Sequence, residues 1–194
     1  QLPLESPDTT KSIKQQINRT KASNNFEIYY SNCTWKVDPA VKFIDGKVTH
    51  YFTVSSATNL IALDLSNNLI VDSVRFRNQK ISFVQTNSDV LNIQLNTTLA
   101  AQQKDSVTIF YNGNPDNSGF GSFIQTTHNN VPVIWTLSEP YGSKDWWPCR
   151  NGLDDKTDSI DIIIQHPFIY KSTANGMLQY EVTNGNTTTT FHKH

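Results

Sequence analysis

The sequence is poor in cysteine and lacks long hydrophobic runs, and each shortage excludes a class of protein. Only two cysteines, Cys33 and Cys149, occur among 194 residues. Neither stands in a CxxC or Cys/His ligand spacing, which excludes a zinc ribbon. No stretch approaches the roughly 18 to 20 consecutive apolar residues that a membrane-spanning helix requires. We therefore expect no membrane span.

Charge is also scarce, because Asp, Glu, Lys and Arg together make up 17% of the residues. Sixteen basic side chains are balanced by seventeen acidic ones, so the formal net charge is −1. A chain with this balance has no broad positive field to attract a phosphate backbone. Nucleic acid is therefore not an expected partner.

The sequence lacks the motifs of several enzyme classes. It contains five histidines, none arranged as the HExxH pair of a zinc hydrolase. It also has no Gly-x-Ser-x-Gly elbow, no P-loop and no dinucleotide fingerprint. We therefore expect no catalytic residue and no metal site within this chain.

The residues that are abundant favour strands. Hydrophobic residues make up 37% of the chain and aromatic residues 11%. From Phe26 onward, short β-branched and aromatic runs alternate with Asn, Asp, Gly and Ser, which is typical of strands and turns. The pattern predicts an all-β protein, either an antiparallel sandwich or a set of paired sheets.

Some of the expected strands and turns can be placed individually. Strands are expected at about Phe26–Tyr30, Thr34–Val37, Lys80–Thr86 and Tyr170–Asn175. Three dipeptides that tolerate a positive φ predict tight hairpin turns. They are Asp45-Gly46, Asn175-Gly176 and Asn184-Gly185.

The chain divides into a leader and one β domain. Residues 1–24 have two prolines and few apolar anchors, so we expect an extended N-terminal leader. Residues 25–194 form the expected β domain. The first residue is Gln1 rather than Met, which indicates a processed product. The last residues, "TTTTFHKH", end within an expected strand, so we expect a domain of a longer protein.

The two cysteines leave two interpretations open. Each lies near a tryptophan, in surroundings expected to be buried. A disulfide between Cys33 and Cys149 would suit an exported protein. Two buried thiols would fit the sequence equally well, because free cysteine is among the residues most often buried.

The most unusual segment is "VIWTLSEPYGSKDWWPCRNGLDDKTDSIDIIIQHP", Val133 to Pro167. It resembles the N-terminal domain of the M1 family of zinc aminopeptidases, in particular the secreted bacterial branch. There, a strand ends at a glutamate or glutamine, and a loop leads to an aromatic-Pro-Cys group, an acidic turn and another strand. The resemblance extends over about residues 26–192.

The resemblance implies a saddle-shaped assembly of antiparallel sheets that serves as the substrate-recognition and structural domain of the enzyme. By its position ten residues before Cys149, Glu139 would bind the free α-amino group of the peptide substrate. Trp146, Trp147 and Pro148 would anchor the loop that carries it. The HExxH helix lies in a catalytic domain absent from this chain, where zinc would polarise the scissile carbonyl and activate water. This chain alone would be inactive.

The resemblance also names partners and a location. The partners are the catalytic domain of the same polypeptide and the N-terminus of a peptide substrate. The location is outside the cytoplasm: periplasmic, cell-surface or extracellular, in a bacterium.

Two alternatives stay open at this point. The first is a non-catalytic β-sandwich module that recognises carbohydrate or protein through exposed tryptophans. Its candidates are Trp35, Trp135, Trp146 and Trp147. The second is a family member that kept the fold but lost its zinc site and acts as a scaffold.

Overall fold

A computed structural model describes residues 20–118, 121–152 and 156–194. Most of the expected leader lies outside these residues. The described parts contain thirteen β-strands and one single-turn 3-10 helix, η1 (Ser143–Asp145). None of their helices is long and apolar enough to cross a membrane. The expectation of an all-β fold with several antiparallel sheets is confirmed.

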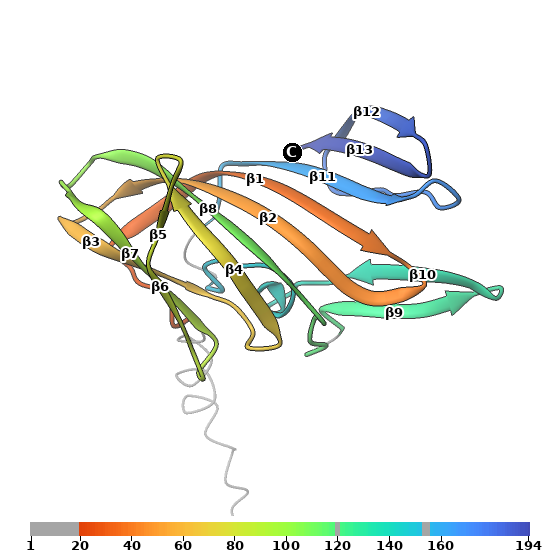
Figure 1. The fold of residues 1–194 in the computed structure, drawn as a ribbon, viewed down its shortest axis with the longest axis horizontal. Helices are drawn as coiled ribbons and strands as arrows, with labels where there is room; N and C mark the ends of the chain where they lie inside the picture. Colours follow the sequence, from red (N-terminus) through yellow and green to blue (C-terminus); the bar gives the residue numbers. More distant parts are fainter. Residues whose placement is uncertain (1–19, 119–120, 153–155) are drawn as a thin grey trace, which may run out of the picture.

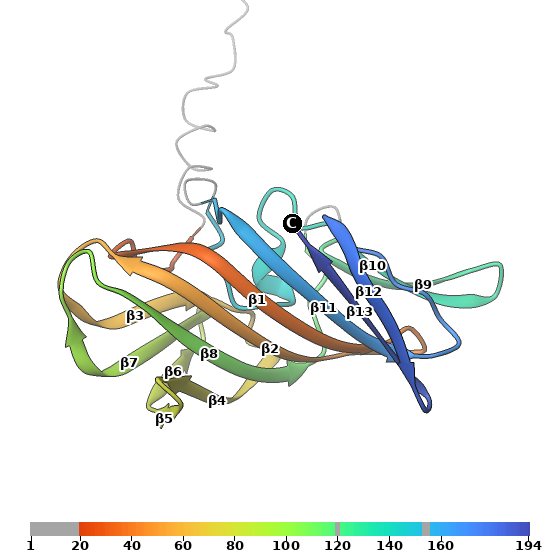
Figure 2. The same ribbon diagram turned by 90° about the horizontal axis from the view of Figure 1, so that it is seen from above.

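The largest unit is an eight-stranded sheet (Figures 1 and 2). All its neighbouring strands are antiparallel except β1 and β11, which run parallel. Figure 2 shows β11, β1, β2 and β8 running side by side along its length. In order across the sheet, the strands are β12 (Met177–Asn184), β13 (Thr187–Lys193), β11 (Ser159–Pro167), β1 (Phe26–Asp38), β2 (Val41–Val54), β8 (Lys104–Gly113), β4 (Leu69–Phe76) and β5 (Gln79–Ile81).

Two smaller sheets accompany the large one. The first has the order β3 (Thr58–Asp64), β7 (Val90–Leu99) and β6 (Phe83–Thr86). The second is a hairpin of β9 (Phe123–His128) and β10 (Val131–Thr136). Figure 1 shows this hairpin extending from the end of the molecule opposite the three-stranded sheet.

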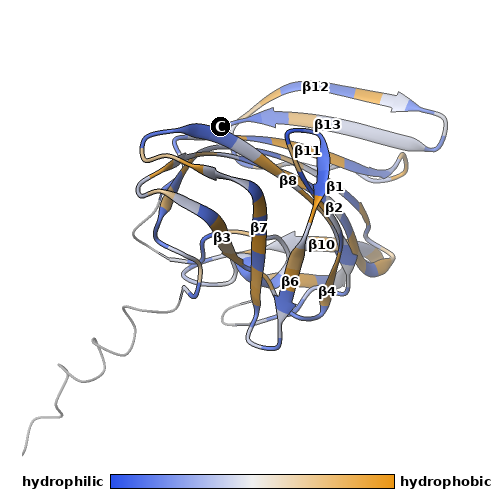
Figure 3. Cartoon of the chain, turned by 60° about the vertical axis from the view of Figure 1, so that its left-hand side comes forward, coloured by the Kyte–Doolittle hydropathy of each residue, from blue (hydrophilic) through white to orange (hydrophobic). Residues whose placement is uncertain are grey.

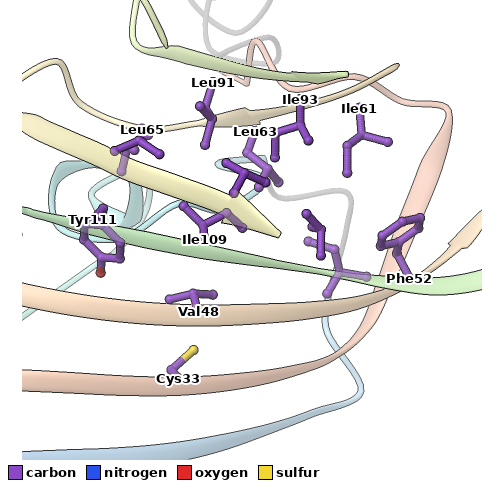
Figure 4. Packing of buried hydrophobic residues seen from close by; sticks show 14 of the residues in the cluster. Cys33, Val48, Phe52, Ile61, Leu63, Leu65, Leu91, Ile93, Ile109 and Tyr111 are labelled. Atoms are coloured by element: carbon purple, nitrogen blue, oxygen red, sulfur yellow. The ribbon is translucent and has the colours of Figure 1, made fainter. Parts of the chain in front are cut away.

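The main core lies between the large sheet and the three-stranded sheet. Figure 3 shows hydrophobic stretches on strands of both sheets. In Figure 4, Leu63, Leu91 and Ile93 come from the three-stranded sheet and approach Val48 and Ile109 of the large one. All five side chains are fully buried. Burying side chains of this size stabilises the fold by about 1.5 to 3 kcal/mol each.

Alternation along β2 explains why one face of the large sheet is buried. Val48, His50, Phe52 and Val54 are buried, whereas the residues between them are partly exposed. Successive side chains of a strand point to opposite faces, so this pattern directs one set toward the core. His50 is thereby placed in the interior.

Several strand predictions were wrong. The two strands expected at Phe26–Tyr30 and Thr34–Val37 are one continuous strand, β1, because the residues between them pair with both β2 and β11. The single strand expected at Lys80–Thr86 is two short strands, β5 and β6, in different sheets.

The turn predictions had mixed outcomes. Asn184-Gly185 begins the turn between β12 and β13, as expected. Asn175-Gly176 is not a hairpin turn, because Tyr170–Asn175 is irregular and no strand precedes β12 there. Asp45-Gly46 lies inside β2. A Cβ at Gly46 would lie 2.3 Å from a ring carbon of Tyr111, so this glycine makes room for an aromatic ring rather than for a turn.

Candidate functional site

Glu139 lies in a tight turn just after β10, which we call the Glu139 turn (Ser138–Gly142). The Gly142 amide donates to the Ser138 carbonyl oxygen at 2.8 Å and closes the turn. The peptide bond between Glu139 and Pro140 is cis. The Glu139 side chain is exposed and makes no hydrogen bond or ion pair with any described residue. Its carboxylate is therefore available to a cation.

Partly buried hydrogen bonds hold the turn on both sides of Glu139. On one side, the Trp146 indole Nε1 donates to Ser138 Oγ at 3.1 Å. On the other, Asn151 Nδ2 donates to the Tyr141 carbonyl oxygen at 2.7 Å. The glutamate is free, but the backbone that carries it is fixed.

Trp146 and Trp147 belong to a cluster of packed rings. The distance between ring centroids is 4.7 Å for Trp35 and Trp146 and 5.9 Å for Trp35 and Trp147. Phe123 adds a further contact to Trp146 at 6.4 Å. Trp35 and Phe123 are buried, and both neighbouring tryptophans pack against the hydrophobic core. Such aromatic pairs contribute about 0.5 to 1.5 kcal/mol beyond burial of their area.

Tyr111 connects this ring cluster to the backbone of Trp146. Trp35 Nε1 donates to the Tyr111 hydroxyl at 3.0 Å, and that hydroxyl donates to the Trp146 carbonyl oxygen at 2.9 Å. Burial raises the pKa of Tyr111, so the phenol keeps the proton that it donates. The bond fixes the main chain at Trp146.

Pro148 is held by a buried histidine. His50 Nε2 lies 2.9 Å from the Pro148 carbonyl oxygen, and His50 Nδ1 lies 2.9 Å from Ser31 Oγ. A carbonyl can only accept, so Nε2 carries the proton and Nδ1 accepts from the serine. Burial lowers the pKa of His50 to about 4, which keeps the ring neutral near pH 7.

Asp64, at the end of β3, ties down the chain beyond Pro148. It exchanges two backbone hydrogen bonds with Cys149, of 2.8 and 3.0 Å. Its buried carboxylate accepts from the Asn151 amide at 3.0 Å, and also from Thr20 Oγ1 and the Lys21 amide. A buried carboxylate with several donors is satisfied rather than reactive. Asp64 therefore has a structural role.

Asp145, in η1, forms hydrogen bonds to the segment before β9. Its buried carboxylate accepts from the backbone amide and hydroxyl of Ser118 and from the hydroxyl of Ser122. Lys144 pairs with Asp89 at 2.8 Å and lies 3.5 Å from Asp145. Partial burial opposes the charge on Lys144, but the bond with Asp89 outweighs it and raises the lysine pKa.

The two cysteines are free thiols in the structure, and both are buried. The structure thus has the second of the two arrangements left open by the sequence, and not the disulfide between Cys33 and Cys149. Burial raises the pKa of both thiols, so neither is activated as a nucleophile.

The exposed carboxylate of Glu139 can bind a cation. Within residues 20–118, 121–152 and 156–194, no group of three or more His, Cys, Asp or Glu side chains could hold a metal ion. The residues that the structure describes do not fit a zinc site. What the Glu139 turn presents is an exposed carboxylate on a backbone held by hydrogen bonds.

The tryptophans bear on the alternative of a carbohydrate-binding module. Trp35 is buried, and Trp146 and Trp147 pack against it and against each other. Trp135, 42% exposed, is the one tryptophan with a largely open side chain. A sugar-binding platform needs accessible ring faces, so three of the four candidates serve packing instead.

Comparison with known proteins decides the family. Residues 23–194 match the family described as the peptidase M1 N-terminal domain. The chain belongs to this family. As an M1 N-terminal domain, it has an all-β fold that other members of known structure share. No curated protein sequence matches it significantly.

Solved structures with the same fold are M1 zinc metallopeptidases. The enzyme from Deinococcus radiodurans superposes with a TM-score of 0.78 at 19% identity, covering 89% of this chain and 39% of that one. A mutant of it bound to a Tyr-Ser-Ala substrate gives the same TM-score at 20% identity, with 89% and 40% coverage. A two-domain M1 mutant bound to L-arginine gives 0.78 at 19%, also with 89% and 40%. At these identities the likeness shows the fold, and the M1 domain spans about 40% of each neighbour.

Sequence reasoning selected Glu139 and the neighbouring Trp-Trp-Pro, but it missed the polar residues that hold them. Asn151 and Asp145 lie within the segment from Val133 to Pro167. Short polar side chains are common in loops, so the sequence does not distinguish these two from ordinary loop residues. Asp64 and His50 lie far away in sequence. Nothing in the sequence of either indicates that its partner is the segment around Pro148 and Asn151, so only the fold reveals them. The role of Glu139 itself stays a prediction.

Proposed function

We propose that this domain supplies the binding group for the α-ammonium of a peptide substrate in a zinc aminopeptidase, with Glu139 as that group. One observation carries the proposal: an exposed carboxylate without a partner among the described residues stands on a turn that hydrogen bonds from Trp146 and Asn151 hold in place. Membership of the M1 family supports it.

The chemistry of recognition follows from charge. A carboxylate and an ammonium form a charge-assisted hydrogen bond, which is about twice as strong as a neutral one. An internal peptide bond carries no such charge and cannot replace the ammonium. A single well-placed glutamate therefore distinguishes the end of a peptide from its middle.

The rigid support matters because binding loses free energy when the binding group must first be ordered. The ring cluster, the His50–Pro148 bond and the Asp64–Cys149 bridge hold the loop before any substrate arrives. Only the glutamate side chain then needs to be ordered on binding.

The remaining chemistry belongs to a catalytic domain of the same polypeptide. There, bound zinc would polarise the scissile carbonyl and activate a water molecule. The residues of this chain would hold the substrate amine at a fixed distance from that centre. Peptide hydrolysis by the full-length protein, its export and its bacterial host stay predictions.

The experiment compares the full-length protein with its Glu139→Gln variant on amino-acid anilides, with and without a chelator. Gln keeps the shape and removes the charge. We expect chelator-sensitive activity and a KM about 10- to 100-fold higher in the variant, as expected for loss of a charged hydrogen bond of about 1.5 to 3 kcal/mol.

Glu27→Gln is the matched control, because Glu27 is another exposed glutamate, on β1. It should leave KM unchanged. An unchanged KM in Glu139→Gln would reject the amine-binding role. An absence of chelator-sensitive activity in the folded full-length protein would instead favour a scaffold.

A further inference from the structure

Asn151 occupies a central position beneath the Glu139 turn. It is 4% exposed, although its side chain is polar. Its Nδ2 donates to the Tyr141 carbonyl oxygen at 2.7 Å, its Oδ1 accepts from the Lys144 amide at 3.4 Å, and its own amide donates to Asp64 Oδ2 at 3.0 Å. The side chain thus links the turn to η1, and the backbone amide of the same residue links both to the end of β3.

The chemistry of an amide is required at this position. Asn has a donor and an acceptor on the same group, so it can bond to a carbonyl and to an amide at once. An ionised aspartate has the same shape but accepts only. It would therefore lose the bond to Tyr141 and place a second carboxylate beside Asp64.

Ser138 has the corresponding place on the other side of the turn. Its hydroxyl accepts from the Trp146 indole, and its carbonyl oxygen accepts from the Gly142 amide. The turn is also confined, because a Cβ at Gly142 would lie 2.6 Å from the Ser122 Cβ. The backbone on both sides of Glu139 is therefore held at short range.

We propose that Asn151 and Ser138 are positioning residues for substrate-amine binding, acting through Glu139. This inference rests on the proposed function of Glu139. Neither residue touches the substrate. Each fixes the direction in which the carboxylate leaves the turn, and that direction determines how well it meets the ammonium.

The test is a double-mutant cycle in the full-length enzyme. Asn151→Ala and Ser138→Ala are each made alone and combined with Glu139→Gln, and kcat and KM are measured for all. Alone, each should raise KM about 3- to 10-fold with little change in kcat. In the Glu139→Gln background, neither should raise KM further, because the carboxylate that they position is gone.

Asn25→Ala is the control for the loss of a hydrogen-bonded side-chain amide elsewhere in the domain. Asn25 Nδ2 donates to Thr58 Oγ1 and the Leu60 carbonyl oxygen, both at 2.9 Å, and contacts no residue of the Glu139 turn through these bonds. It should leave KM unchanged. Folding of every variant is checked by its unfolding temperature, and Ser138→Ala provides the milder of the two changes.

The outcomes separate this inference from the proposed function. If Glu139→Gln raises KM but the Asn151 and Ser138 effects persist at full size beside it, the positioning role is wrong and the amine-binding role stands. An equal fall in kcat for both variants, in both backgrounds, also overturns the positioning role. If Glu139→Gln itself leaves KM unchanged, the proposed function fails first.

Discussion

His50 donates a hydrogen bond from its Nε2 to the carbonyl oxygen of Pro148, 98 positions along the chain. The bond joins the middle of the largest sheet to the loop that carries the candidate site. The bond requires a proton on Nε2, and the bond that Nδ1 accepts from Ser31 requires that the ring be neutral. Protonation would remove the acceptor for the Ser31 hydroxyl and place a positive charge in the interior.

The free energy of unfolding should fall as pH is lowered through this group. Burial lowers the pKa of His50 from 6.5 to about 4, so the unfolded chain binds the proton more readily than the fold does. The stabilisation is fully present above about pH 6.5 and is lost as pH falls toward 4. At its limit, the effect amounts to about 3 kcal/mol.

Urea unfolding at a series of pH values measures this loss. His50→Gln is the comparison, because its amide can still donate to Pro148 but does not titrate. The variant should lose less stability than the parent between pH 6.5 and 4. Identical pH profiles for the two proteins would contradict the assignment of acid sensitivity to His50.

Gly46→Ala should destabilise the protein strongly. The added Cβ would lie 2.3 to 2.6 Å from three atoms of the Tyr111 side chain, including its hydroxyl oxygen. Overpacking of a core costs about 1 to 3 kcal/mol, and displacing Tyr111 also strains its bonds to Trp35 and Trp146. Thermal unfolding gives the measurement.

Gly185→Asn is the control for this change. Gly185 has a φ of +57°, which asparagine tolerates, and a Cβ there would meet no atom within 4 Å. A change below about 0.5 kcal/mol is expected. If Gly46→Ala were equally mild, Tyr111 would have room to move, and the close packing described here would be wrong.

Cys33 and Cys149 should both remain unreactive in the folded protein. Both thiols are buried, and burial raises their pKa, so little thiolate forms near pH 7. A thiol reagent should detect almost no free thiol before denaturation and two thiols per chain afterwards. Cys33–Cys149-linked peptides in a non-reducing digest would show instead that the disulfide forms.

The sequence was sufficient for the all-β class because local alternation directs side chains to one face. Prediction from the sequence was less reliable where the conformation of a residue depends on a contact with a residue far away in the chain. Asp45-Gly46 has the composition of a hairpin turn, yet Gly46 stays within β2 to accommodate Tyr111. Only the pairing of β2 with β8 brings these two residues together.

In the candidate site, too, local features could be predicted from the sequence and long-range contacts could not. The resemblance to a known family selected Glu139 and the aromatic residues, because those residues are rare and ordered along one segment. The buried partners Asp64 and His50 come from other strands and look like ordinary strand residues. Their contribution depends on how strands pack, which spacing along the chain does not encode.

The parallel pairing of β1 with β11 also has a consequence for synthesis on the ribosome. Tyr30 pairs with Ser159, so this edge of β1 has no neighbour until most of this domain has been synthesised. An unpaired edge can join a strand of another molecule, and contacts between distant residues form slowly. The nascent chain therefore passes through a stage in which its first strand is exposed to aggregation and to chaperones.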